Sequence, residues 1–176
     1  MMKKLLTADQ IEQALNKMLL DIIKDIPQDG SFAIVGIRSR GEVLAKRLCS
    51  TIEGKTGRKV LCGTLDITLY RDDLNAPKGK HQPRVQATEI EFDVDDKFIL
   101  LVDDVLQTGR SVRAALDALT DMGRPKTIRL AVLVDRGHHE LPIHADYVGV
   151  RAEAPAGQSV KVYLMECDNR DEVVIE

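Results

Sequence analysis

Residues 99–111 constrain the fold and function of this chain more than any other segment. Four apolar residues, 99–102, are typical of a buried strand in a parallel sheet. Two carboxylates, Asp103 and Asp104, follow, and the sequence Thr-Gly-Arg-Ser at 108–111 then opens an amphipathic helix. Backbone N–H groups at a helix N-terminus, together with neighbouring hydroxyls, favour an anion. We therefore predict a phosphate-binding turn beside a pair of acids.

The two acids indicate which kind of phosphate compound would bind. Carboxylates repel a bare phosphate, but they suit a ligand that carries a diol and a divalent metal between its charged ends. A sugar phosphate with ribose hydroxyls fits that requirement. The chain has no Gly-x-x-x-x-Gly-Lys-Ser/Thr motif of the nucleotide-binding P-loop. A receiver domain is also disfavoured, because its acidic pair follows the first strand, whereas only 72 residues follow Asp104 here.

Length and composition predict one globular domain spanning residues 1–176. We expect a soluble, cytoplasmic protein, because the sequence has neither a signal peptide nor an apolar run of about 18 residues that would span a membrane. Three widely spaced cysteines indicate reduced thiols rather than a disulfide framework or a zinc site. The net charge of −3 disfavours non-specific attraction to nucleic acid.

Strand-like and helix-like patterns alternate along the chain. A capping box at residues 7–10 begins a helix that ends at Pro27. Further helices are expected from Gly41 to near Gly54, and from the turn at residues 108–111 to Gly123. Strands are expected at residues 32–37, 59–68, 98–103, 128–134, 146–150 and 160–165. The alternation predicts an α/β fold with a central, mostly parallel sheet flanked by helices.

Four loops follow these strands, and in an open α/β sheet such loops meet at one edge. They are the basic turn 38–41, the long polar loop 70–90, the acidic pair with its phosphate turn, and residues 135–139. The loop 70–90 contains two prolines and no periodicity, which predicts a flexible lid. Cations, acids and phosphate donors at one edge indicate an anionic, metal-dependent substrate.

The chain resembles the bifunctional pyrimidine operon attenuator/uracil phosphoribosyltransferase family. The matching segments are residues 35–41, 65–74, 99–119, 131–143 and 145–149. The resemblance implies the type I phosphoribosyltransferase fold and the reaction of uracil with 5-phosphoribosyl-1-pyrophosphate (PRPP), which gives UMP and pyrophosphate with Mg²⁺. We also expect a homo-oligomer, either a dimer or a tetramer.

The resemblance also assigns roles to individual residues. Asp103 and Asp104 would hold the ribose diol and orient metal-bound water, Ser39 and Arg40 would bind pyrophosphate, and Arg71 would reach over the leaving group. The turn that would bind PRPP and UMP consists of Val105, Leu106, Gln107, Thr108, Gly109, Arg110 and Ser111. Because such reactions pass through an oxocarbenium-like centre, the protein must stabilise separating charge and exclude water. A lid that closes over bound PRPP suits this need.

Two features depart from the family pattern. Gln107 occupies a position where purine-using relatives carry Asp and pyrimidine-using members usually carry an aromatic residue. It argues against 6-oxopurines, and it is either a tolerated substitution or a change of specificity. The basic face through which regulatory members bind RNA is also altered, and Lys17 alone keeps a fixed positive charge there. The aligned positions are Asn16, Lys17, Leu20, Asp25, His139, His144 and Val150.

Three functional hypotheses follow. The first is an enzyme that makes UMP, and the second is an RNA-binding regulator of pyrimidine genes with little catalysis. The third is a non-catalytic PRPP or nucleotide sensor. The altered face disfavours RNA binding, since phosphate neutralisation supplies much of RNA affinity, whereas Arg71 and the long loop favour the enzyme over the sensor. His138 and His139 are expected in a surface loop rather than at a metal site.

Overall fold

The computed structural model describes residues 3–72, 85–155 and 157–176. Its centre is a five-stranded sheet in the order β3-β2-β4-β5-β6, in which all neighbouring strands run parallel. The strands are β2 (Phe32–Ile37), β3 (Leu61–Leu65), β4 (Phe98–Leu106), β5 (Thr127–Asp135) and β6 (Tyr147–Arg151). The predicted α/β class and central parallel sheet are therefore confirmed.

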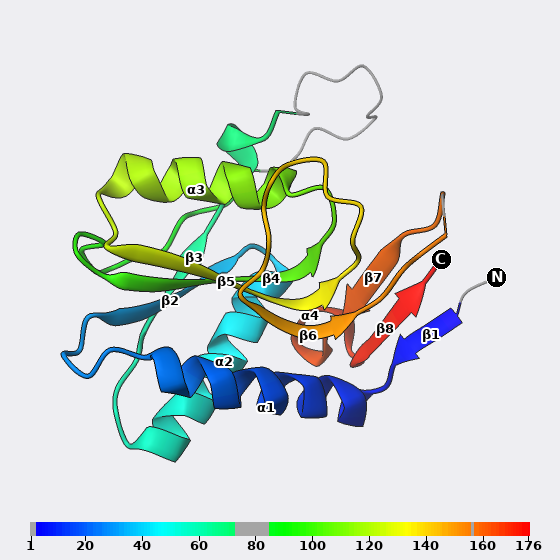
Figure 1. Ribbon diagram of the computed structural model, residues 1–176, viewed down its shortest axis with the longest axis horizontal. Coiled ribbons are helices and arrows are strands. Elements are labelled where there is room, and N and C mark those ends of the chain that lie inside the picture. Colours follow the sequence, from blue (N-terminus) through cyan, green and yellow to red (C-terminus); the bar gives the residue numbers. More distant parts are fainter. Residues whose placement is uncertain (1–2, 73–84, 156) are drawn as a thin grey trace.

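Helices cover both faces of this sheet. One face packs against α1 (Ala8–Asp25) and α2 (Arg40–Thr56), and the other packs against α3 (Arg110–Met122) (Figure 1). In β2, Ile34 packs in the core on the α1 and α2 side, whereas Ala33 and Val35 pack in the core on the α3 side. Burial on both faces explains why the central strands are apolar throughout rather than alternating.

The helix α1 begins and ends where the sequence predicts. The Thr7 hydroxyl accepts the Gln10 N–H, and the Gln10 side chain accepts the Thr7 N–H at 2.9 Å, which completes the capping box. The helix α2 ends at Thr56, two residues beyond its predicted end near Gly54. Gly57 caps it, with a left-handed φ of 67° and an N–H that donates to the Glu53 carbonyl. Within the described ranges, no helix is long and apolar enough to cross a membrane.

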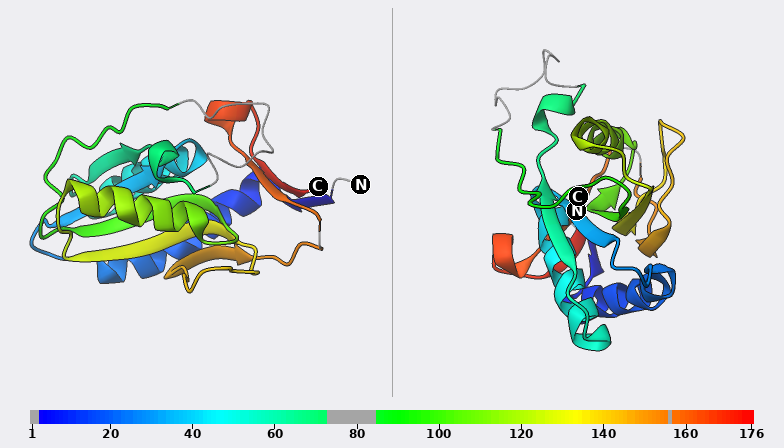
Figure 2. Two further views of the ribbon diagram at one scale, coloured as in Figure 1. Left: turned by 90° about the horizontal axis from the view of Figure 1, so that it is seen from above. Right: turned by 90° about the vertical axis from the view of Figure 1, so that its left-hand side faces the viewer.

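A second, antiparallel sheet lies beyond the carboxyl ends of the parallel strands (Figures 1 and 2). Its order is β1-β8-β7, from β1 (Lys3–Leu6), β8 (Glu172–Ile175) and β7 (Val160–Tyr163). The short helix α4 (Met165–Asp168) joins β7 to β8. The strand expected at residues 160–165 therefore ends at Tyr163 and belongs to this second sheet. Neither β1 nor β8 was predicted from the sequence, because strands of four residues carry little periodicity.

Two central strands differ from their predicted lengths. Strand β4 continues through Leu106, because its pairing with β5 extends to Leu106 opposite Asp135. The strand predicted at residues 98–103 therefore runs three residues further, and Asp104 as well as Asp103 lies within it. Strand β3 covers only Leu61–Leu65, because the Asp66 carboxylate accepts the Thr68 N–H at 3.0 Å and turns the chain into η1 (Thr68–Tyr70).

The predicted lid is only partly described. Residues 68–70 form η1, and Glu89 bridges to Thr64 in antiparallel fashion. Residues 73–84 lie outside the described residues. The structure therefore places the two ends of the loop 70–90 beside β3, and the prediction of a flexible lid stays a prediction.

Candidate active site

A cavity of about 290 Å³ lies at the carboxyl edge of the parallel sheet. It brings together the loop after β2, the loop after β3 and the end of β4. The lining residues are Ile37, Arg38, Ser39, Arg40, Asp66, Ile67, Thr68, Arg71, Gln86, Asp103, Asp104, Val105 and Ser111. The predicted site residues that therefore meet at one place, from the loops after β2 and β3, from β4 and from α3, are Ser39, Arg40, Arg71, Asp103, Asp104, Val105 and Ser111.

A second cavity, of about 230 Å³, adjoins the first and shares Asp104, Val105 and Ser111 with it. It runs along the turn between β4 and α3, with one residue from the second sheet. Its lining residues are Asp104, Val105, Leu106, Gln107, Thr108, Gly109, Ser111, Val112 and Val160. Together the two cavities have room for an extended ligand with a charged group at each end.

Asp103 is buried and Asp104 is half-buried beside the first cavity, and Asp104 also lines the second cavity. The Asp103 side chain accepts the Asp104 N–H at 2.9 Å, and the Asp104 side chain accepts the Val105 N–H at 2.8 Å. Burial, reinforced by the Asp104 charge, raises the pKa of Asp103 well above its usual range. Burial also raises the pKa of Asp104, although the Arg40 guanidinium opposes part of that shift. Raised pKa values mean that the fold disfavours the ionised forms, so a cation bound beside the pair would favour ionisation of both carboxyls.

The turn after β4 presents backbone donors to the second cavity. Gly109, the N-cap of α3, has a φ of 90°, a left-handed conformation that favours glycine. The Thr108 carbonyl accepts the N–H groups of Glu140 and Leu141 at 3.0 and 3.1 Å, which anchors the turn. Four N–H groups at this turn donate to no other described residue, those of Gln107, Thr108, Gly109 and Ser111. Such a cluster of donors at a helix N-terminus suits a phosphate.

Arg110 differs from its neighbours in this turn. Its guanidinium donates to Glu140 at 2.9 Å and to Asp72 at 2.6 Å, on the solvent side of the turn. Arg110 lines neither cavity. Leu106 has a side chain that is 1% exposed and packed in the core, so it meets the second cavity through its backbone. The Arg110 side chain is thus held by Glu140 and Asp72 and lines neither cavity, and its predicted role in binding PRPP stays a prediction.

The loop after β2 contains a cis peptide bond between Arg38 and Ser39. Arg38 is held by Glu42 at 3.0 Å and by Glu89 at 3.1 Å. Sequence reasoning missed Asp66, whose carboxylate accepts the Gln86 N–H at 2.7 Å and so ties the two ends of the long loop together beside the cavity. The strand predicted at residues 59–68 included Asp66, so its position directly after β3 became clear only from the structure.

The loop after β5, the fourth predicted loop, lines neither cavity. His139 and Asp135 in this loop pair at 2.9 Å, and the His139 and His144 rings meet edge to face with centroids 5.4 Å apart. Within the described part of the chain, no three His, Cys, Asp or Glu side chains are grouped as they would be around a metal ion.

Comparisons with known proteins agree with this geometry. A model of the phosphoribosyl transferase domain family matches residues 1–164. The Bifunctional protein PyrR of Pelotomaculum thermopropionicum is 51% identical over 172 residues, which cover 98% of this chain and 94% of that protein. The Bifunctional protein PyrR of Limosilactobacillus fermentum is 46% identical over 176 residues, which cover 100% of this chain and 98% of that protein.

Solved structures also match the fold. A hypoxanthine-guanine phosphoribosyltransferase from Bacillus anthracis aligns with a TM-score of 0.73 and 15% identity, covering 98% of this chain and 96% of that one. A hypoxanthine phosphoribosyltransferase from Staphylococcus aureus aligns with a TM-score of 0.70 and 18% identity, covering 97% and 90%. At these identities the likeness shows a shared fold alone.

Proposed function

The chain belongs to the PyrR family of type I phosphoribosyltransferases, and from that premise we propose that it transfers ribose 5-phosphate from PRPP to uracil. The products are UMP and pyrophosphate. One observation carries the proposal: a turn with unused N–H donors and an acid pair adjoin each other across two connected cavities. A phosphate and a ribose diol, the two features that PRPP and UMP share, match these two sites.

The placement of PRPP follows from the charges around the cavities. The 5′-phosphate takes the N–H groups of Gln107, Thr108, Gly109 and Ser111, and the ribose hydroxyls meet Asp103 and Asp104. The pyrophosphate then lies in the first cavity, which Arg40 and Arg71 line. In this placement each phosphate meets donors or cations, and the acids meet hydroxyls.

The acid pair fits Mg²⁺. Its two carboxylates, one buried and one half-buried, are mutually repulsive, so a divalent cation offsets the cost of keeping them ionised. Mg²⁺ retains several waters and takes one or two carboxylates plus substrate phosphates, so a third acidic ligand is not required. When bound, it would neutralise charge on the leaving pyrophosphate.

The chain's own groups then favour departure of the pyrophosphate. As the bond from the ribose anomeric carbon to pyrophosphate breaks and the bond to uracil N1 forms, positive charge develops on the sugar ring, and the N1 proton of uracil is given up to the basic pyrophosphate or to water. Asp103 and Asp104 lie in a buried, low-dielectric setting, where fixed negative charge stabilises that ring strongly. Arg40 and Arg71 hold the leaving group, whose negative charge grows at the same time.

The base specificity is tested by a panel of nucleobases. Gln107, which is exposed at the second cavity, offers a neutral amide rather than a carboxylate. We expect uracil to support pyrophosphate release from PRPP and Mg²⁺ at least about 100-fold faster than hypoxanthine or guanine, which is within the range that a hydrogen-bonding pocket provides. A reaction without base is the control. Equal or faster release with hypoxanthine would contradict uracil specificity.

RNA regulation is the second candidate function, because the curated relatives are called bifunctional. The face of α1 aligned with the RNA-binding positions carries little uncompensated positive charge. Leu20 is 61% exposed there, Lys24 is paired with Asp21 at 2.8 Å, and Asp25 accepts the Tyr147 hydroxyl at 2.6 Å. Since each lost phosphate contact weakens binding through counterion release, we propose that RNA affinity is weak.

A titration with a pyrimidine-operon leader hairpin at physiological salt tests this proposal. We expect no sequence-dependent binding at pH 7.5, with or without UMP, and a hairpin of scrambled sequence serves as the control. A second titration at pH 6.0 is informative, because histidines gain positive charge at lower pH. Nanomolar binding that distinguishes the two hairpins at pH 7.5 would make regulation a main function.

A further inference from the structure

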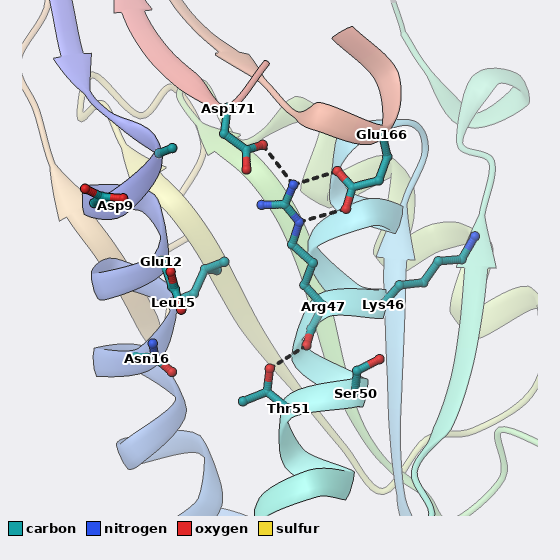
Figure 3. A pocket seen from close by; sticks show the side chains of 11 residues that line it. Asp9, Glu12, Leu15, Asn16, Lys46, Arg47, Ser50, Thr51, Glu166 and Asp171 are labelled. Atoms are coloured by element: carbon teal, nitrogen blue, oxygen red, sulfur yellow. Dashed lines mark hydrogen bonds and ion pairs between the residues drawn. The ribbon is translucent and has the colours of Figure 1, made fainter. Parts of the chain in front are cut away.

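The second sheet is attached to α2 through carboxylates on and just after α4. Arg47 of α2 donates to the Glu166 carboxylate at 2.9 and 2.6 Å, and its Nη2 also donates to Asp171 at 2.8 Å. Figure 3 shows this arginine reaching up from α2 between the two acids. Because the Arg47 guanidinium pairs with two carboxylates, it fixes the position of α4 relative to α2.

Arg40 makes the matching contact about two helical turns earlier on the same face of α2. Its Nε donates to Asp168 Oδ2 at 3.2 Å, and its Nη2 donates to Asp168 Oδ1 at 2.8 Å. The side chain of Asp168 is 17% exposed and that of Arg40 is 33% exposed. Arg40 is also a residue of the first cavity, whereas Arg47 is not.

Backbone N–H groups at the start of α4 hold Asp168 and Asp171 in place. Asp168 Oδ2 also accepts the Leu164 N–H at 2.9 Å, and Asp171 similarly accepts the Met165 N–H at 2.8 Å. Both carboxylates are therefore fixed before they meet their arginines. The remaining guanidinium nitrogen of Arg40, Nη1, donates to no residue in the described ranges.

We propose that Asp168 is a positioning residue, which orients Arg40 for the pyrophosphate of PRPP. This inference rests on the proposed function. Asp168 holds the Nε and Nη2 edge of the guanidinium and leaves Nη1 for an anion in the first cavity. A free arginine side chain loses considerable rotamer entropy when it binds a ligand. In this protein, that loss occurs during folding, when Arg40 pairs with Asp168, and not during binding.

The orientation of Arg40 strengthens pyrophosphate binding, but the charge of Asp168 weakens it, since a carboxylate near the cavity repels an anion. Two features favour orientation as the larger effect. The contact is bidentate, and the carboxylate makes a backbone hydrogen bond as well, so little of its charge faces the cavity unpaired. Orientation predicts weaker pyrophosphate binding in Asp168→Asn, whereas charge repulsion predicts tighter binding. This difference makes the proposal testable.

The experiment measures binding of Mg²⁺-pyrophosphate by calorimetry. In Asp168→Asn, we expect the dissociation constant to rise about tenfold, and the KM for PRPP to rise more than kcat falls. Asp171→Asn is the matched control, because it removes a similar carboxylate from Arg47 and leaves Arg40 untouched. Its dissociation constant should stay within about twofold of that of the wild type.

The same substitution in a protein that lacks Arg40 distinguishes a loss of Arg40 orientation from general damage to the second sheet. In an Arg40→Gln protein, Asp168→Asn should change pyrophosphate binding less than about twofold, because the arginine that it orients is gone. If Asp168→Asn weakened pyrophosphate binding equally in the wild type and in the Arg40→Gln protein, the proposal would be overturned. Unchanged or tighter pyrophosphate binding in the single Asp168→Asn variant would also overturn it. If the wild type itself binds no pyrophosphate, the proposed function fails rather than this inference.

Discussion

Replacing Asp104 by Asn is expected to lower kcat for UMP formation by about 10²–10³, the range found when one preorganised charge-stabilising group is removed. The substitution keeps the size of the side chain and an acceptor for the Val105 N–H. It removes one of the two negative charges that lie where the positive sugar ring forms. Steady-state kinetics with uracil and PRPP measure the effect, and a variant with wild-type kcat would refute the assignment.

The same substitution should stabilise the protein at neutral pH. Because the pKa of Asp104 is raised in the fold, its contribution to stability is fully present below the unfolded value near 3.8 and is lost as the pH rises through the folded value. Asn has no charge to bury, so Asp104→Asn should raise Tm at pH 7.5, and the gain should shrink as the pH falls toward 4. A Tm difference that is independent of pH would contradict this account.

Gly41→Ala is expected to destabilise the protein by about 1–3 kcal/mol, the usual cost of overpacking. A Cβ on Gly41 would lie 2.5 Å from the Val102 carbonyl oxygen and 3.1 Å from the Asp103 Cα. Because both neighbours are backbone atoms of β4, the start of α2 must move away from the acid pair. We therefore expect the KM for PRPP to rise together with the loss of stability.

Gly54→Ala in the same helix is the control. No heavy atom lies within 4 Å of its added Cβ, and its backbone conformation is ordinary. Alanine should stabilise the helix there by about 0.5–1 kcal/mol. Chemical unfolding compares the two variants directly. A Gly41→Ala protein as stable as Gly54→Ala would show that α2 does not need its close approach to β4.

Local sequence patterns predicted much of the central fold. The uninterrupted apolar residues of β2 identified that strand at its observed bounds, and the capping box at Thr7 placed the start of α1. The site was predicted from the rule that parallel strands present their following loops at one edge. That rule alone places Arg40, Arg71 and the acid pair at a common edge, and all four residues line the first cavity.

Tertiary contacts determined the rest. The bounds of β4 depend on its ladder with β5, and a local pattern cannot show how far such a ladder runs. The place of Arg110 in the turn gave no sign that its side chain pairs with Glu140 and Asp72, and its predicted role in binding PRPP stays a prediction. The contact between Arg40 and Asp168 joins residues 128 positions apart, a separation that no single-sequence pattern reveals.

The structure of the protein crystallised with UMP tests the central claim most directly. The account predicts that the 5′-phosphate lies against the N–H groups of residues 107–109 and 111 and that the ribose hydroxyls meet Asp103 and Asp104. The uracil ring would then lie in the second cavity, near Gln107. A phosphate bound away from that turn, for example in the groove between α1 and α2 (Figure 3), would contradict the account.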